Sequence, residues 1–239
     1  MVRLSERLEI IASCITKGDR VADIGTDHGF LPIYLYQKEL CSQIVLCDIN
    51  KGPLDKAREN ISKHLPGEKM DLRLGDGLDP VRLGECNCAI IAGMGGRLII
   101  SILEKNLEKA LSFDKLILQP RNGQVELREW LIVNHFSIRD ELLAQEGNYI
   151  CEIIVATGKP GEGIVEFPDV PEEIKKLSRE ISPLLFIKKD SYLPDLIRQK
   201  IRIDRDIMDE ISRGGGGEDR LPMVIEHRNL LERLLEMEV

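Results

Sequence analysis

The segment VADIGTDHG, residues 21–29, constrains the fold of this chain more than any other part of the sequence. Val21 and Ile24 are typical of the end of a buried strand, and Gly25 and Gly29 allow a tight turn from that strand into a helix. The amides in the first turn of such a helix face a bound ligand. The segment therefore predicts a strand, a turn and a helix that hold a small molecule.

Short β-branched runs alternate with longer helical patterns along the first two thirds of the chain. Strands are expected at 20–24, 44–48, 70–74, 88–92 and 115–119, and helices at 4–15, 32–38, 52–64, 96–108 and 126–134. This alternation predicts an α/β fold built from parallel βαβ units. Two further runs, 137–145 and 149–157, are separated only by a Glu-Gly-Asn turn and predict an antiparallel hairpin that ends the sheet.

The segment KPGEGIVEFPDVP, residues 159–171, is rich in proline and glycine and predicts a linker. It separates an expected first domain, residues 1–160, from a second, residues 169–239. Four glycines at 214–217 then mark a reversal between two helical patterns, so two helices are expected to pack antiparallel as a coiled-coil-like hairpin. The apolar residues of these patterns are Leu193, Leu196, Ile203, Ile207, Ile211, Leu221, Ile225, Leu231 and Leu235.

The glycine spacing of the first turn decides between two classes of cofactor. A dinucleotide site needs the pattern GxGxxG so that the pyrophosphate can lie on the backbone. In this chain Asp27 stands between Gly25 and Gly29, and its negative charge opposes a pyrophosphate. The turn therefore predicts S-adenosylmethionine, which carries an ammonium and a sulfonium group, with Asp23 near its methionine part. A dinucleotide site and a turn without any ligand are the alternatives.

Carboxylates at the ends of the next two strands extend the expected cofactor site. Asp48 lies 25 residues beyond Asp23, the distance at which a second-strand carboxylate reaches the ribose hydroxyls of an adenosine cofactor. Asp76 can accept a hydrogen bond from the adenine amino group, although a solvated strand end or an ordinary turn explains either residue. Met94 flanks the cofactor or fills the core. The expected cofactor-binding residues are Asp23, Gly25, Asp27, Gly29, Asp48, Ile49, Asp76, Gly77 and Met94.

Two more segments, IIAGMGG at 90–96 and LILQPRNG at 116–123, end strands at the same edge of the sheet. Open α/β sheets bind ligands in the crevice at this edge, so the methyl acceptor is expected there. The second segment is also compatible with a plain loop. The candidate acceptor-binding residues are Gln119, Arg121 and Asn122, and Arg7 and Arg97 are further cations for the cofactor carboxylate or for a phosphate.

Composition narrows the range of partners. The net charge of −8 gives no general attraction for a polyanion, so nucleic-acid binding requires a local basic face. Cys86 and Cys88 form a lone CxC pair without further ligands nearby, so no metal is expected. No apolar run approaches the roughly 18 residues of a membrane span, and a soluble, cytoplasmic protein without membrane association is expected.

Taken together, the motifs RLSERLEIIA, DIGTDHGFLP, LCDIN, GDGL, IAGMGG and LQPRNG resemble the bacterial tRNA adenine-N1-methyltransferases that modify position 22, the TrmK family. The resemblance spans residues 3–158. It implies a class I Rossmann-like methyltransferase domain followed by an all-helical coiled-coil-like domain, and methyl transfer from S-adenosylmethionine to an adenine of tRNA. A methyltransferase of another substrate, or a non-catalytic interaction protein on the same fold, is the alternative function.

The chemistry of adenine N1 needs little from the protein. Ring N1 carries an in-plane lone pair, so alignment and shielding from water suffice without a strong base. The product is a cation, which a nearby carboxylate would stabilise. Asp27, with His28 beside it, is therefore the candidate for catalysis, although both residues could merely shape the cofactor turn.

The helical tail raises a separate question. It could grip tRNA, form a solvated face or mediate dimerisation, and the sequence leaves the oligomeric state open. The basic residues that would contact tRNA are Lys188, Lys189, Arg198, Lys200, Arg202 and Arg205.

Overall fold

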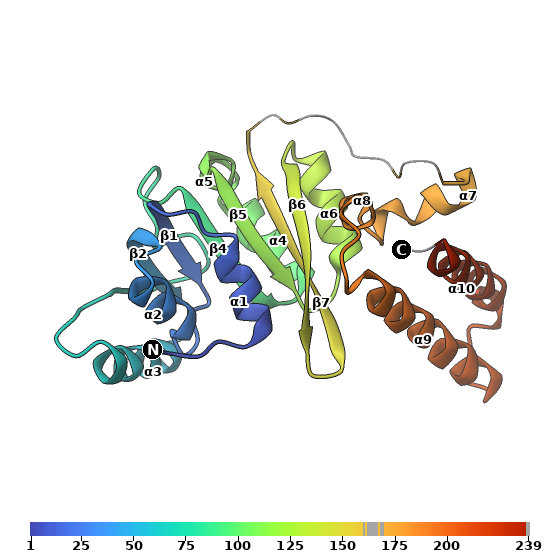
Figure 1. Cartoon of the computed structure of the whole chain (residues 1–239), viewed down its shortest axis with the longest axis horizontal. Coiled ribbons are helices and arrows are strands. Elements are labelled where there is room, and N and C mark those ends of the chain that lie inside the picture. Colours follow the sequence, from blue (N-terminus) through green and yellow to red (C-terminus); the bar gives the residue numbers. More distant parts are fainter. Residues whose placement is uncertain (160, 162–166, 168–169, 238–239) are drawn as a thin grey trace. The chain divides into compact units, whose positions relative to one another are not determined.

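The computed structural model describes residues 1–159, 161, 167 and 170–237, which form two compact units (Figure 1). The first unit comprises Met1–Ala144 and Cys151–Gly163, and the second comprises Gln145–Ile150 and Ile164–Val239. Six residues around the tip of the expected hairpin therefore group with the helical tail. The expected domain boundaries at residues 160 and 169 lie outside the described residues, as does much of the expected linker.

A seven-stranded sheet organises the first unit, with the strand order β3-β2-β1-β4-β5-β7-β6. Strands β1 to β5 pair in parallel, and β7 runs antiparallel to β5. This confirms the prediction of five parallel strands closed by a hairpin. The strands are β1 (Asp19–Ile24), β2 (Cys41–Asp48), β3 (Asp71–Leu74), β4 (Cys88–Met94), β5 (Lys115–Pro120), β6 (Ser137–Glu146) and β7 (Tyr149–Thr157).

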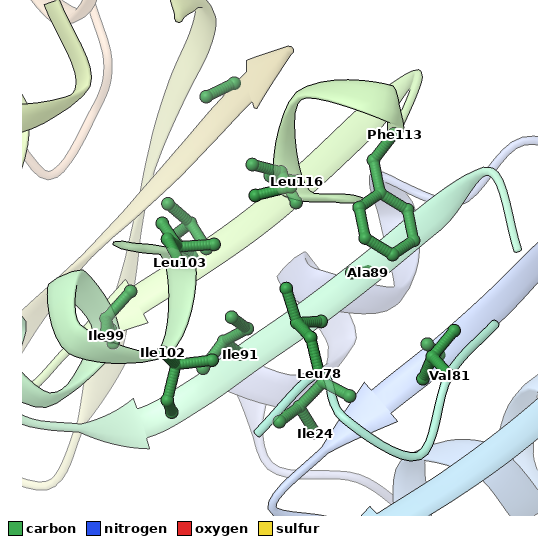
Figure 2. Close-up of a cluster of buried hydrophobic side chains, with 14 of the residues drawn as sticks. Ile24, Leu78, Val81, Ala89, Ile91, Ile99, Ile102, Leu103, Phe113 and Leu116 are labelled. Carbon is green, nitrogen blue, oxygen red and sulfur yellow. The ribbon is translucent and has the colours of Figure 1, made fainter. Parts of the chain in front are cut away.

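Helices cover both faces of this sheet, because side chains alternate between the two faces along each strand. Ala22 and Ile24 of β1 belong to one buried cluster. Figure 2 shows Ile24 in this cluster with Leu103 of α4 (Gly96–Lys105). Val21 belongs to a second cluster, which includes Ile61 of α3. The helices of the first unit are α1 (Glu6–Ser13), α2 (Phe30–Gln37), α3 (Lys51–His64), α4 (Gly96–Lys105), α5 (Leu107–Ser112) and α6 (Gln124–Val133).

The helix predicted at 96–108 is interrupted, and this part of the prediction was wrong. Asn106 separates α4 from α5 and has non-helical backbone angles, φ −129° and ψ 45°. Its side-chain amide donates a hydrogen bond to Asp79 Oδ1 at 2.9 Å. An asparagine that bonds outside its own helix favours a helix end, a long-range effect that the apolar pattern does not contain.

The second unit contains more breaks than the sequence pattern predicted. Pro183 and Pro194 stand in the first turns of new helices, because proline lacks the amide hydrogen that a helix interior requires. The two long helices, α9 and α10, pack against each other and are joined by residues 213–220. The elements are α7 (Glu172–Lys175), a 3₁₀ turn (Lys176–Arg179), α8 (Pro183–Lys188), α9 (Leu193–Ser212), a second 3₁₀ turn (Glu218–Arg220) and α10 (Leu221–Glu236).

The buried face of α9 differs from the expected apolar stripe. Ile203, expected on that stripe, is 52% exposed, whereas Ile201 and Asp204 are buried. The helical period places Ile203 away from the face that continues through Ile197 and Ile201. A buried aspartate interrupts the apolar seam of a coiled coil, so the coiled-coil character is not confirmed.

Asp204 is buried because it pairs with His227 of α10. His227 Nδ1 lies 2.8 Å from Asp204 Oδ2, and its Nε2 lies 2.6 Å from Glu180 Oε2. The hydrogen bond to Glu180 raises the pKa of His227 to about 9, against a partial opposing effect of burial. The imidazolium therefore holds α9, α10 and the segment around Glu180 together at neutral pH.

We expect His227→Gln to lower the free energy of unfolding of the second unit by about 2 kcal/mol at pH 7, a value discounted for partial exposure. The charged form stabilises the fold fully below the unfolded pKa of about 6.5 and loses this effect as the pH rises through about 9. Urea unfolding at pH 6, 7.5 and 9 should show a decline in the wild type that His227→Gln lacks. His135→Asn, at an exposed turn, is the control. Equal pH dependence in wild type and His227→Gln would contradict the pairing.

Three features bear on the expectations from composition. Burial raises the pKa of the Cys86 thiol to about 11, so this cysteine stays protonated at neutral pH. Within the described ranges, no group of three or more metal-ligating side chains was found. No helix in the described part of the chain is long and apolar enough to cross a membrane.

Candidate active site

A cavity of about 450 Å³ lies at the carboxyl ends of the central strands of the first unit. The strand order reverses between β1 and β4, the place where open α/β sheets bind ligands. The volume suits a small molecule. Eight of the nine expected cofactor-binding residues line this cavity: Asp23, Gly25, Asp27, Asp48, Ile49, Asp76, Gly77 and Met94.

The two glycines of the first turn have different structural roles. Gly25 has a φ of +78°, and a Cβ at this position would overlap the Cε of Met94. Gly29 has a φ of +70° and caps α2, where a Cβ would lie 3.1 Å from the Cβ of Ala57 in α3. The absence of a side chain at Gly25 thus allows Met94, in the cavity wall, to lie close to the end of β1. Gly29 lets α2 and α3 pack and is not among the lining residues.

Two buried carboxylates lie at neighbouring strand ends. Asp23 is the penultimate residue of β1 and is 6% exposed, and Asp48 ends β2 and is 8% exposed. The pKa of Asp23 is raised to about 6, chiefly by burial and also by the negative charge of Asp48, against a lowering effect of Thr26. Asp48 Oδ1 accepts a hydrogen bond from the Asn50 amide at 2.8 Å. Two adjacent acids in a low-dielectric site strongly favour a cationic ligand.

Asp76 is held by a contact that the sequence reasoning missed. Its carboxylate lies 2.7 Å from Lys105 Nζ of α4, and the same ammonium lies 2.7 Å from Asp79. Both side chains of the Asp76 pair are half exposed. A ligand that donates a hydrogen bond to Asp76 must therefore share this carboxylate with Lys105.

The two candidate catalytic residues lie together at the cavity. Asp27 has a φ of +47°, a left-handed conformation that is uncommon for a residue other than glycine. Its Oδ2 lies 3.6 Å from His28 Nε2, and both side chains remain substantially exposed. The turn thus places a carboxylate and an imidazole side by side on the cavity wall.

Gln119, an expected acceptor-binding residue, is 2% exposed and is not among the lining residues. Its Oε1 accepts hydrogen bonds from Arg7 Nη1 at 3.0 Å and from the Gly93 amide at 3.1 Å. Gln119 therefore fixes the Gly93 loop and positions Arg7, which does line the cavity. The sequence indicated Arg7 only as one of two cationic candidates.

Of the other two acceptor-binding candidates, Arg121 lines the cavity and Asn122 does not. Arg121 lines the cavity and its side chain lies over Gly93. The backbone carbonyl of Asn122 accepts a hydrogen bond from the Gly96 amide at 2.8 Å, which fixes the loop after β5. Neither Asn122 nor Arg97 is among the lining residues.

The sequence reasoning also missed the apolar part of the cavity wall. Leu8 and Ile102 lie within helices, and Phe30 and Leu31 follow Gly29. An apolar side chain in either place has the pattern of an ordinary core residue, so the sequence alone gave no sign of these cavity residues. Phe30 is notable because it is 37% exposed at the start of α2. The apolar residues missed are Leu8, Phe30, Leu31, Leu98 and Ile102.

The basic residues of the tail are partly neutralised within the second unit. Arg198 lies 2.8 Å from Asp195, Arg205 lies 3.1 Å from Glu232, and Lys200 lies 3.4 Å from Glu180. At least three of the six expected contact residues thus have acidic partners. The hypothesis that this unit grips tRNA stays a prediction.

Known proteins are similar to this chain in fold and in sequence. A family model described as a methyltransferase domain matches residues 4–154, which include every residue of the cavity. The fold and the site therefore define a class I Rossmann-like methyltransferase.

The relatives narrow the class further. The tRNA (adenine(22)-N(1))-methyltransferase of Bacillus subtilis strain 168 is 30% identical over 236 residues, 99% of this chain and 97% of the relative. The crystal structure of B. subtilis TrmK is similar with a TM-score of 0.81 at 29% identity, covering 98% of this chain and 100% of that one. Streptococcus pneumoniae Sp1610 in complex with S-adenosyl-L-methionine gives 0.80 at 26% identity, with coverage of 98% and 100%. The chain belongs to the TrmK family of tRNA (adenine(22)-N(1))-methyltransferases.

Proposed function

We propose that this protein transfers a methyl group from S-adenosylmethionine to N1 of adenine 22 in tRNA. The observation that carries the proposal is the similarity to the B. subtilis enzyme over 99% of the chain. The acidic cavity at the switch point of the sheet supports it independently, because this cavity suits a cationic cofactor.

The residues of the cavity fit S-adenosylmethionine by their chemistry. The buried Asp23 is suited to the ammonium group, and Asp48 is suited to the ribose hydroxyls. Ile49, which is 61% exposed in the cavity wall, offers an apolar surface to the adenine ring. Asp76 can accept from the adenine amino group while it shares its charge with Lys105. The absence of a Cβ at Gly25 keeps the strand end open for the methionine part.

The bound cofactor supplies a methyl group activated by its sulfonium charge. The adenine N1 lone pair forms the new N–C bond while the C–S electron pair stays on sulfur, so no proton has to leave. The positive charge passes to the adenine, and we assign its stabilisation to Asp27, which lines the cavity. His28 lies beside this carboxylate and completes the wall on that side.

The acceptor side of the cavity carries positive charge. Arg121 and Arg7 both line the cavity, and we assign them to phosphate or carboxylate groups of the two substrates. Gln119 and Asn122 act behind them by fixing the loops after β4 and β5. Of the three acceptor-binding candidates, Arg121 is thus the one proposed to contact tRNA directly.

Transfer of labelled methyl from S-adenosylmethionine tests the function. A tRNA transcript with adenine 22 should accept about one methyl group per molecule, and the same transcript with guanine 22 should accept none. Equal labelling of both transcripts would indicate another target in tRNA. Cofactor binding without transfer to any tRNA would favour a methyltransferase of another substrate, and absence of cofactor binding would favour a non-catalytic interaction protein.

A further inference from the structure

Two aromatic rings stack on each other in the wall of the cavity. The ring centroids of His28 and Phe30 are 5.8 Å apart, and their planes differ by 19°. Both residues line the cavity. The His28 side chain is 45% exposed and Phe30 is 37% exposed, so the pair presents open ring surface.

Two residues of α3 and the glycine before α2 hold this ring pair in place. The backbone carbonyl of His28 accepts a hydrogen bond from Asn60 Nδ2 of α3 at 2.9 Å. The ring of His64, the last residue of α3, meets Phe30 edge to face at 6.4 Å with an interplanar angle of 70°. Gly29 fixes the distance between α2 and α3. The rings are therefore oriented before any ligand arrives.

An open aromatic surface in a polar cavity needs an explanation. Most large apolar side chains of the first unit lie in its two buried clusters, whereas Phe30 belongs to neither cluster. The proposed partners of the ammonium and ribose hydroxyl groups of the cofactor are Asp23 in β1 and Asp48 in β2. Phe30 begins α2 and is therefore not part of these strand ends. A flat, unpaired base is the ligand that such a surface suits, because bases stack on Phe and His rings.

We propose that the stacked pair of His28 and Phe30 is the platform on which the target adenine lies during methyl transfer. This rests on the proposed function and adds the residue Phe30 to the acceptor site. A ring face attracts a cation more strongly than a neutral ring. The platform therefore binds the methylated, positively charged adenine more strongly than the starting base, with Asp27 beside it.

A double-mutant cycle between Phe30 and the target base tests the platform. Full-length protein saturated with S-adenosylhomocysteine is titrated with two tRNAs, one with adenine 22 and one with an abasic site at that position. Phe30→Leu should weaken binding of the intact tRNA about tenfold, the size expected for one base stacked on a ring. It should change binding of the abasic tRNA less than twofold.

Two variants serve as controls. Phe30→Trp keeps a ring and should bind intact tRNA within threefold of wild type. Tyr36→Leu removes an aromatic of similar exposure, 40%, from the same helix and outside the cavity lining, and should leave tRNA binding unchanged. Affinity for S-adenosylhomocysteine should stay within twofold in all three variants.

The outcomes distinguish a failure of the platform hypothesis from a failure of the proposed function. Equal loss on both tRNAs in Phe30→Leu, or no loss on either, would overturn the platform while an active wild type preserves the proposed function. A wild type that does not methylate adenine 22 would overturn the proposed function itself.

Discussion

Replacement of Asp23 by asparagine should weaken S-adenosylmethionine binding about 50-fold at pH 7.5. The side chain is 6% exposed, so its charge acts in a low-dielectric site at the end of β1. A hydrogen bond to a charged partner contributes about 1.5–3 kcal/mol, which corresponds to a roughly 10- to 150-fold change in affinity. The asparagine keeps the shape of the aspartate and removes the charge.

The same variant should abolish a pH dependence. Because burial raises the pKa of Asp23 to about 6, the carboxylate takes up a proton as the pH falls through 6. Binding of an ammonium group requires the ionised form, so the dissociation constant of the wild type should rise by up to about tenfold per pH unit below 6 and level off above 7. Asp23→Asn should show a flat profile over this range.

Isothermal titration with S-adenosylmethionine between pH 5 and 8 measures both effects. Asp19→Asn is the matched control, because Asp19 is a buried aspartate at the opposite end of β1 and outside the cavity lining. An Asp23→Asn protein that binds the cofactor as tightly as Asp19→Asn would exclude Asp23 from the cofactor site.

Replacement of Asp27 by asparagine should lower the single-turnover rate about 30-fold at saturating cofactor and tRNA. We propose that this carboxylate, which lies at the cavity, stabilises the positive charge that develops on adenine, and the expected effect is reduced for its exposure in the free protein. Asparagine tolerates the left-handed backbone at this position, so the turn should persist. Rapid-quench measurement of methyl transfer gives the rate directly.

The affinity for S-adenosylmethionine distinguishes two roles of Asp27. It should change less than threefold in Asp27→Asn, because the buried carboxylates of the proposed cofactor site are Asp23 and Asp48. A large loss of affinity with an unchanged single-turnover rate would make Asp27 a cofactor-binding residue only.

Local sequence patterns predicted much of the fold of the first unit. The strand ends at Asp23 and Asp48 and the turn at Gly25 follow from residues adjacent in the chain, and these features converge in one cavity. A sheet with parallel strands brings its carboxyl ends to one edge, so motifs far apart in sequence can be assigned to one site. The TrmK resemblance drew on the same motifs, which the family comparison supports.

Long-range contacts could not be predicted in this way. Lys105 reaches Asp76 across 29 positions, and Gln119 reaches Arg7 across 112. No periodic pattern in the sequence shows which distant side chains the fold brings into contact. Phe30 was missed for a related reason, since an aromatic at a helix start is indistinguishable in sequence from a core residue until its exposure is known.

In the second unit, ion pairs change how the basic residues of the tail are interpreted. The sequence indicated basic residues on the tail, but their acidic partners lie on other turns or helices, as with Arg205 and Glu232. Ile203 was misplaced because an apolar residue at an approximate helical interval need not lie on the buried face. A charged pair, Asp204 with His227, occupies that face instead.

The identity of the methylated nucleoside tests the central claim most directly. A tRNA transcript with adenine 22 is incubated with the protein and S-adenosylmethionine, digested to nucleosides and analysed by mass spectrometry against standards, and the position is mapped by reverse transcription. The account predicts 1-methyladenosine at position 22 and at no other position. N6-methyladenosine, or 1-methyladenosine at another position, would contradict it.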